Sequence, residues 1–204
     1  MQSNSSSTNR RILIVDDSPT IHHDFRTILA PPPSDNSLES AEAELFGEGG
    51  SGAADVVYEV DSAHQGDEGV RRVVQSLAEN RPYALAFVDV RMPPGIDGIE
   101  TTEQLFKADA RVHVVICTAY SDHSWKKIID RLGVTDRLLI LKKPFDSIEV
   151  RQLALAMTTK WQNQLIADQK RDEMQQWLDE LNALVAGTQV DGAVTTPLPA
   201  PARA

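Results

Sequence analysis

Three apolar runs in this chain are each followed at once by charged side chains. Asp16 and Asp17 follow the first run, Asp89 follows the second and Lys143 follows the third. In an open parallel sheet the carboxyl ends of the strands meet at one crevice, so side chains far apart in sequence are expected to converge there. The pattern therefore predicts an α/β sheet with three carboxylates and one ammonium at one edge.

Carboxylates gathered in this way repel each other. Two like charges about 4 Å apart cost roughly 4 kcal/mol at an effective dielectric near 20, so the cluster needs a bound cation or a proton. Ligands that are all oxygen favour a hard divalent ion, and Mg²⁺ is commonly held by a few carboxylates together with a phosphate. Carboxylates, Mg²⁺ and a lysine together indicate phosphoryl chemistry.

The composition limits the partners and the compartment. The chain has 204 residues, 41% of them hydrophobic, and a formal net charge of -10, which favours one core and argues against nucleic acid and anionic membrane as partners. Cys117 is the only cysteine, so a disulfide framework is excluded and a buried, inert thiol is expected. No stretch is long and apolar enough to span a bilayer, and a cytoplasmic location is predicted.

Five apolar runs alternate with segments of helical character along the chain. Four of the runs show little alternation, as expected for strands buried on both faces, whereas the second alternates like an edge strand. The fold class predicted is α/β, with a flavodoxin-like, doubly wound, five-stranded parallel sheet in the order 2-1-3-4-5 and an extended C-terminal helix. Strands one and three are then neighbours, and Asp17 is expected to face Asp89. The predicted strands cover residues 11–15, 56–61, 84–88, 112–117 and 138–141.

Capping residues mark the helices between these strands. Ser18 and Pro19 open the first helix, which Pro31 stops, and Gly133 is placed to cap the fourth. Asp146 followed by Glu149 resembles a capping box, which starts the last helix. The second helix is expected to direct four apolar side chains inward, namely Val70, Val73, Val74 and Leu77. The expected helices after the first cover residues 66–77, 98 onward, about 122–132 and 147–185.

The predicted domain plan has one core domain with additions. Residues 11–160 form the domain, interrupted by an insertion at about 31–55 that is too long and too rich in Pro and Gly for an ordinary connection. Residues 161–186 form a helical extension. The ends, residues 1–10 and 187–204, have the composition of disordered tails.

The helical extension carries a short apolar seam. Met174, Trp177, Leu181 and Leu184 follow the three-four-three spacing of a coiled coil. Because the seam is shorter than three heptads, the pattern leaves two alternatives open. One is a homodimer through the C-terminal helix, and the other is a helix folded back on its own domain.

Four motifs in order resemble one known family. They are Asp16-Asp17, the segment from Asp89 to Gly98 with its Pro93-Pro94 pair, the step Thr118-Ala119, and Lys143-Pro144. Each motif follows its own predicted strand in the sequence. Over about residues 11–160 the chain resembles the response regulator receiver domain of the CheY-like superfamily, in a variant with an enlarged loop after the first helix and a long C-terminal helix.

The resemblance implies a role for each site residue. Asp89 is the phosphoacceptor, and Thr118 and Lys143 contact the transferred phosphoryl group. Mg²⁺ is held by Asp17 and Asp89 directly, by Asp16 through water, and by the backbone carbonyl of Arg91. The same resemblance leaves the isomer of the Lys143–Pro144 bond open.

The resemblance also implies partners and limits. The donor is a histidine kinase or phosphotransfer protein, and phosphorylation switches the binding of a downstream protein. The chain is then not an enzyme, beyond slow self-phosphorylation and self-dephosphorylation. Ile140 stands where many receivers carry an aromatic switch residue, so the signal is expected to pass through packing instead, and Tyr120 is a candidate gate to the phosphate.

Three other interpretations compete with a free-standing receiver. The chain could be a receiver module of a larger histidine kinase or diguanylate cyclase, or a scaffold and dimerisation module. A phosphatase of the haloacid-dehalogenase type also uses an aspartate at a strand end, but it requires a second aspartate two positions later. Arg91 occupies that position here, which disfavours the phosphatase.

Overall fold

The computed structural model describes residues 8–31, 56–119 and 125–188. In these ranges one sheet holds five parallel strands in the order β2-β1-β3-β4-β5, as predicted from the apolar runs. The central strands are buried on both faces, which is why their sequences show no alternation. The strands are β1 Arg11–Val15, β2 Glu59–Ala63, β3 Leu85–Asp89, β4 His113–Ala119 and β5 Leu138–Lys143.

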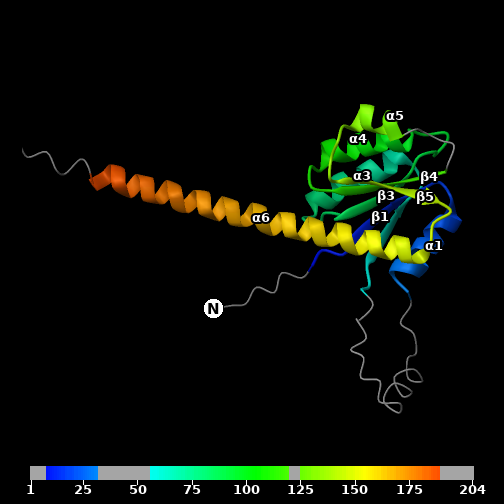
Figure 1. Cartoon of the computed structure of the whole chain (residues 1–204), viewed down its shortest axis with the longest axis horizontal. Helices are drawn as coiled ribbons and strands as arrows, with labels where there is room; N and C mark the ends of the chain where they lie inside the picture. Colours follow the sequence, from blue (N-terminus) through cyan, green and yellow to red (C-terminus); the bar gives the residue numbers. More distant parts are fainter. Residues whose placement is uncertain (1–7, 32–55, 120–124, 189–204) are drawn as a thin grey trace, which may run out of the picture. The chain divides into compact units, whose positions relative to one another are not determined.

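Helices cover both faces of the sheet (Figure 1). Helix α1 and the first part of α6 pack on one face, where Ile14 lies among Phe25 and Val150. Helices α3, α4 and α5 pack on the other face, where Leu13 contributes to the core. The helices are α1 Pro19–Leu29, α3 Gly66–Ala78, α4 Gly98–Ala108, α5 Trp125–Leu132 and α6 Ser147–Thr188.

Two of the predicted helix caps are confirmed. The backbone N–H of Asp146 donates to Glu149 Oε2 at 3.1 Å, and Asp146 Oδ1 accepts from Ile148 N at 2.7 Å, which completes the capping box of α6. Gly133 ends α5 with a φ of 76°, a left-handed conformation that glycine adopts without strain.

Strand β2 begins later than predicted. Val56 and Tyr58 pack against the core, but the ladder with β1 starts only at Glu59. The N–H of Tyr58 donates instead to the carbonyl of Leu29, at the end of α1. Apolar side chains before a strand can thus contribute to the core without belonging to the strand, and the apolar run alone misplaced its start.

Helix α3 directs three of its four predicted apolar side chains inward, and Val70 and Leu77 pack against the core. Val73 is buried as expected, but Val74 is 54% exposed, so its predicted inward position was wrong. The buried face also includes Gly66, Gly69 and Ser76. A Cβ on Gly69 would lie 2.9 Å from the Val15 side chain, so the missing side chain lets the helix lie close against β1.

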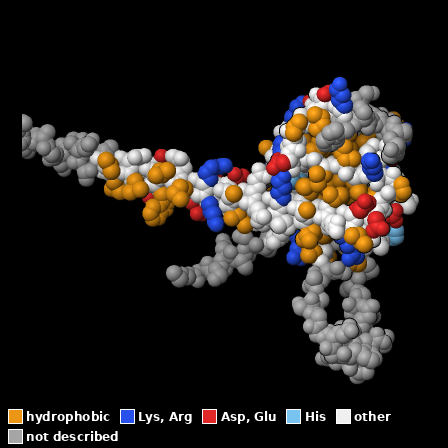
Figure 2. Space-filling model, viewed as in Figure 1, with side chains coloured by type: hydrophobic (Ala, Val, Ile, Leu, Met, Phe, Trp, Pro, Cys, Tyr) orange, Lys and Arg blue, Asp and Glu red, His pale blue; other side chains and the backbone are white. Residues whose placement is uncertain are grey.

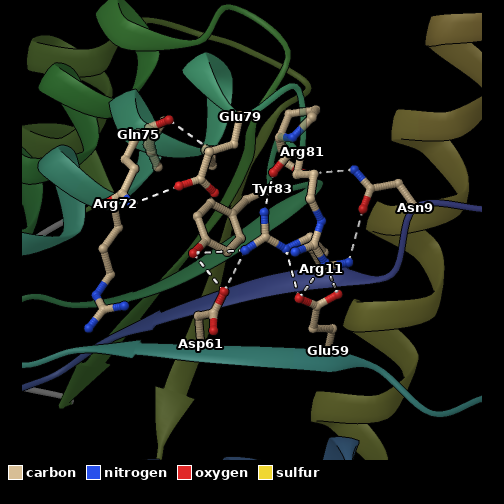
Figure 3. Close-up of polar contacts among 12 residues, drawn as sticks. Asn9, Arg11, Glu59, Asp61, Arg72, Gln75, Glu79, Arg81 and Tyr83 are labelled. Carbon is tan, nitrogen blue, oxygen red and sulfur yellow. Dashed lines mark hydrogen bonds and ion pairs between the residues drawn. The ribbon is translucent and has the colours of Figure 1, made fainter.

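A network of charged side chains joins the amino-terminal ends of β1, β2 and β3 (Figure 3). Arg11 Nη2 donates to Asp61 Oδ2 at 2.7 Å, and Tyr83 Oη donates to the same oxygen at 2.7 Å. The Arg11 guanidinium also lies 4.4 Å from the centre of the Tyr83 ring and pairs with Glu59 at 3.2 Å. Arg81 in turn binds both oxygens of Glu59. We call these five residues the Arg11 network.

The chain divides into two compact units, residues 1–162 and 163–204, and α6 contributes to both. In the first unit Asn9, from the predicted N-terminal tail, donates its backbone N–H to Gln162 Oε1 at 3.2 Å and its side chain to the carbonyl of Pro82 at 2.9 Å. Most of the predicted insertion, Tyr120 and most of both predicted tails lie outside the described residues. None of the described helices is long and apolar enough to cross a membrane.

Candidate functional site

The carboxyl ends of β1, β3 and β5 bring three of the predicted site residues together. Lys143 Nζ donates to Asp16 Oδ2 at 2.7 Å and to Asp89 Oδ1 at 2.6 Å. Asp16 directly follows β1, Asp89 ends the neighbouring β3, and Lys143 ends β5. One ammonium therefore bridges two carboxylates, and we call these three residues the acid–lysine cluster.

The cluster is largely withdrawn from solvent. The side chains of Asp16, Asp89 and Lys143 are 4%, 12% and 23% exposed. Burial by itself lowers the pKa of the Lys143 ammonium, but the hydrogen bonds to the two carboxylates outweigh it, and the pKa is raised. The lysine is therefore charged, and two carboxylates share its single positive charge.

Backbone N–H groups hold the other oxygens of both carboxylates. Ser18 N donates to Asp16 Oδ1 at 2.9 Å, and Arg91 N donates to Asp89 Oδ2 at 2.8 Å. Each aspartate binds the N–H two residues further along the chain, which is the geometry of an Asx turn. The turns fix both side chains in place with one oxygen toward Lys143.

The start of α4 lies directly behind Asp89. A Cβ on Gly98 would be 2.0 Å from the Asp89 carbonyl oxygen, and Gly98 N donates to the carbonyl of Val90 at 2.9 Å. Asp97 caps the helix by accepting from Glu100 N at 2.7 Å. The Asp97-Gly98 pair at the end of the sequence motif thus allows this close approach. Two peptide bonds near the site are cis, namely Pro93–Pro94 and Lys143–Pro144.

Thr118 lies beside the cluster, without a direct link to it. The sheet register places Cys117 opposite Asp89, so Thr118 stands one residue beyond it on β4. The Thr118 hydroxyl donates to the carbonyl of Ala119 at 3.0 Å. Among the described residues no hydrogen bond joins Thr118 to Asp89 or Lys143.

Asp17 is exposed, and Asp16 is the acid of the pair that shares Lys143 with Asp89. In residues 8–31, 56–119 and 125–188 no group of three His, Cys, Asp or Glu side chains is arranged to hold a metal ion. The donor chemistry nevertheless suits Mg²⁺, because two carboxylates converge and a third follows Asp16 directly.

His22 contacts the site in a way that the sequence did not indicate. Its side chain is 5% exposed, and Nε2 lies 2.7 Å from the backbone carbonyl of Asp16. A carbonyl only accepts, so Nε2 carries the hydrogen. Burial, the largest influence, lowers the pKa of His22 and favours the neutral ring. The spacing of His22 with Phe25 and Leu29 was a signal for burial, but nothing in the sequence indicated the contact with Asp16.

The Cys117 thiol is buried, as expected. Removal from water raises the pKa of this thiol far above its ordinary value. The reactive thiolate is therefore scarce, and Cys117 acts as a small apolar residue in the core beneath α1 and α6.

A family model described as the response regulator receiver domain matches residues 53–155, about half of the chain. The matched range includes Asp89, Thr118 and Lys143 but begins after β1, so the model does not cover Asp16 and Asp17. Among curated proteins no relative matches the chain.

Solved structures show the same fold at low sequence identity. A CheY-like receiver domain protein from Methanospirillum hungatei is 21% identical with a TM-score of 0.53, covering 76% of this chain and 98% of its own. The receiver domain of AraT from Geobacillus stearothermophilus is 19% identical with a TM-score of 0.54, covering 77% and 98%. The N-terminal domain of a three-domain response regulator, sensory box and GGDEF protein from Carboxydothermus hydrogenoformans is 17% identical with a TM-score of 0.50, covering 76% and 98%.

Proposed function

We propose, because the chain belongs to the response regulator receiver domain family, that it accepts a phosphoryl group on Asp89 and thereby switches the binding of a protein partner. The observation that carries this proposal is the bridge from Lys143 to Asp16 and Asp89 at the buried ends of three strands. Charged groups that are desolvated together in this way are typical of functional sites rather than of surface ion pairs.

The proposed step is a nucleophilic displacement at phosphorus. A carboxylate oxygen of Asp89 forms a bond to phosphorus while the bond from phosphorus to the donor breaks, and the donor keeps the electron pair. The product is a mixed carboxylic–phosphoric anhydride on Asp89. Lys143 is already 2.6 Å from Asp89 Oδ1, so its ammonium is placed to pair with a phosphoryl oxygen as that oxygen arrives.

Thr118 supplies the proposed response to phosphorylation. Its hydroxyl has a weak local partner, the carbonyl of Ala119 at 3.0 Å. Turning this hydroxyl toward a phosphoryl group on Asp89 would replace a neutral acceptor with a charged one, which makes a stronger hydrogen bond. The end of β4 would then move with Thr118, and Ile140 on the neighbouring β5 would transmit the shift by packing.

Mg²⁺ would neutralise negative charge on the transferring group. We propose that Asp17 and Asp89 hold it directly, that Asp16 holds it through water, and that the backbone carbonyl of Arg91 completes the protein ligands. Asp17 is exposed in the structure, so a cation from solvent can reach its carboxylate.

The proposed donor is a histidine kinase or phosphotransfer protein, whose phosphorylated imidazole is the leaving group. The chain is then a signalling protein that hydrolyses its own anhydride slowly, rather than an enzyme with turnover. A cytoplasmic location agrees with the reduced, buried Cys117. A second candidate is a receiver module of a larger signalling protein, as in the three-domain structural neighbour.

Intact-mass measurement after incubation with acetyl phosphate and Mg²⁺ tests the proposal. We expect the mass of one phosphoryl group to be gained and then lost on treatment with hydroxylamine, which cleaves acyl phosphates. Asp89→Asn and chelation of Mg²⁺ should each abolish the gain. Asp67→Asn, which changes an exposed aspartate on α3, is the matched control and should be labelled like the wild type. Label retained by Asp89→Asn would contradict the assignment of Asp89.

A further inference from the structure

The C-terminal part of α6 exposes a dense group of large apolar side chains. Six of them fall within twelve residues, and each is between 47% and 69% exposed. Figure 2 shows hydrophobic side chains gathered along this part of the helix. They are Met174, Trp177, Leu178, Leu181, Leu184 and Val185.

These side chains form one stripe. At about 100° per residue, residues 174, 177, 178, 181, 184 and 185 fall within an arc of about 120°. The opposite side of the helix carries polar residues such as Gln176 and Asp179. Proteins rarely expose a contiguous apolar patch larger than a few hundred Å² unless it binds something. We call residues 174–185 the α6 stripe.

We propose that the α6 stripe is covered by the same stripe of a second copy of this chain, in a parallel two-stranded coiled coil. Met174 and Leu181 take the a positions, and Trp177 and Leu184 take the d positions of two consecutive heptads. A stripe with this spacing is complementary to itself under a two-fold rotation, so a second copy needs no other matching surface.

The charged residues beside the stripe favour the parallel orientation. Glu173 and Glu180 take the g positions, and Leu178 and Val185 take the e positions. In a parallel pair each g position faces an e position of the partner, so the glutamate stems cover apolar side chains. In an antiparallel pair with the same core layers, Glu173 of one copy would face Glu180 of the other, and like charges would repel.

The length of the stripe predicts a reversible dimer. Two heptads bury less surface than a typical permanent interface, so association should depend on protein concentration. The stripe lies in the unit of residues 163–204, and the acid–lysine cluster lies in the unit of residues 1–162. The dimer therefore does not rest on the phosphoacceptor role of Asp89.

Sedimentation velocity of the full chain over a range of concentrations tests the dimer. The wild type and Asp89→Asn should both rise toward twice the monomer mass as concentration increases. Leu181→Lys places a charge in the seam and should remain monomeric. Asn182→Lys adds the same charge at the next, polar position and should still dimerise. A wild type that stays monomeric throughout, or a Leu181→Lys variant that dimerises like the wild type, would overturn the proposal.

Cross-linking tests the orientation. In the parallel pair residue 181 faces its own copy, so Leu181→Cys should form a disulfide-linked dimer under a mild oxidant, while Cys117 remains buried and unlinked. Asn182→Cys, which faces away from the seam, is the control and should cross-link far more slowly. Equal cross-linking of the two variants would rule out the parallel arrangement.

Discussion

Two clusters of charged side chains lie at opposite ends of β1, and they differ in charge balance. In the Arg11 network two guanidinium groups, of Arg11 and Arg81, meet two carboxylates, of Glu59 and Asp61. In the acid–lysine cluster two carboxylates share one ammonium. The charged groups of the first cluster sum to zero, and the two carboxylates and one ammonium of the second sum to one negative charge.

This difference supports the proposal that the acid–lysine cluster is the functional one. Balanced ion pairs with additional hydrogen bonds hold strands together and leave little demand for a ligand. An unbalanced buried cluster costs free energy and accommodates a further cation, which is what phosphoryl transfer with Mg²⁺ requires. If the functional site were chosen by the density of polar contacts alone, the Arg11 network would be chosen. The charge balance favours the acid–lysine cluster as the functional site instead.

The largest expected effect is the loss of phosphorylation in Lys143→Met. The substitution removes the cation closest to Asp89, and removing one such group costs about 100-fold in rate in comparable sites. Initial rates of labelling by acetyl phosphate measure this loss. Lys142→Met, at the exposed neighbouring position, is the matched control and should retain nearly the wild-type rate. A Lys143→Met rate close to that of the wild type would remove the functional distinction between the two clusters.

The next effect concerns stability at the other end of β1. Arg11→Met should lower the free energy of unfolding by about 2 kcal/mol, because the guanidinium hydrogen-bonds a carboxylate and is 13% exposed. Urea denaturation measures the change. Arg71→Met is the control, since Arg71 pairs with Asp67 at the exposed surface of α3, where such pairs contribute about 0.5 kcal/mol or less.

Both arginine variants should be phosphorylated at the wild-type rate, since neither side chain belongs to the acid–lysine cluster. A fall in labelling of folded Arg11→Met, with Arg71→Met unaffected, would show that the two ends of β1 are coupled.

The sequence predicted the sheet well because its central strands are buried on both faces. The run at residues 11–15 became β1 without change, and the strand order is the flavodoxin-like one that is common among five-stranded doubly wound sheets. The start of β2 was misplaced because Val56 and Tyr58 pack into the core without joining the ladder. Residues with buried side chains usually also pair with a neighbouring strand, but at the start of β2 they do not.

The site was predicted at the level of strand ends but not of individual contacts. Placing Asp16, Asp89 and Lys143 at one edge needed only the parallel order. Which acid of the Asp16-Asp17 pair meets the lysine depends on the turn after β1, where Ser18 N binds Asp16 and leaves Asp17 exposed. The contact of His22 with the Asp16 carbonyl likewise depends on how α1 packs, which no local pattern encodes.

The smallest expected effect is a loss of about 1 kcal/mol in the free energy of unfolding of Tyr83→Phe. The pH dependence of this loss tests the role of the Asp61 charge. Although burial by itself raises the pKa of Asp61, the hydrogen bonds from Tyr83 and Arg11 lower it below the ordinary value of 3.8. As the pH falls, the Asp61 carboxylate is therefore protonated in the unfolded chain before it is protonated in the folded protein. The stability contributed by Asp61 is present above pH 3.8 and is lost below it.

Tyr83→Phe removes one of the two hydrogen bonds and should weaken this pH dependence. Free energies of unfolding of the wild type and the variant should therefore differ near neutral pH and converge as the pH falls through the lowered pKa of Asp61. Phosphorylation at neutral pH should be unchanged, because Tyr83 lies in the balanced network. A constant difference across the whole pH range would mean that the Tyr83 hydroxyl stabilises the fold without acting through the Asp61 charge.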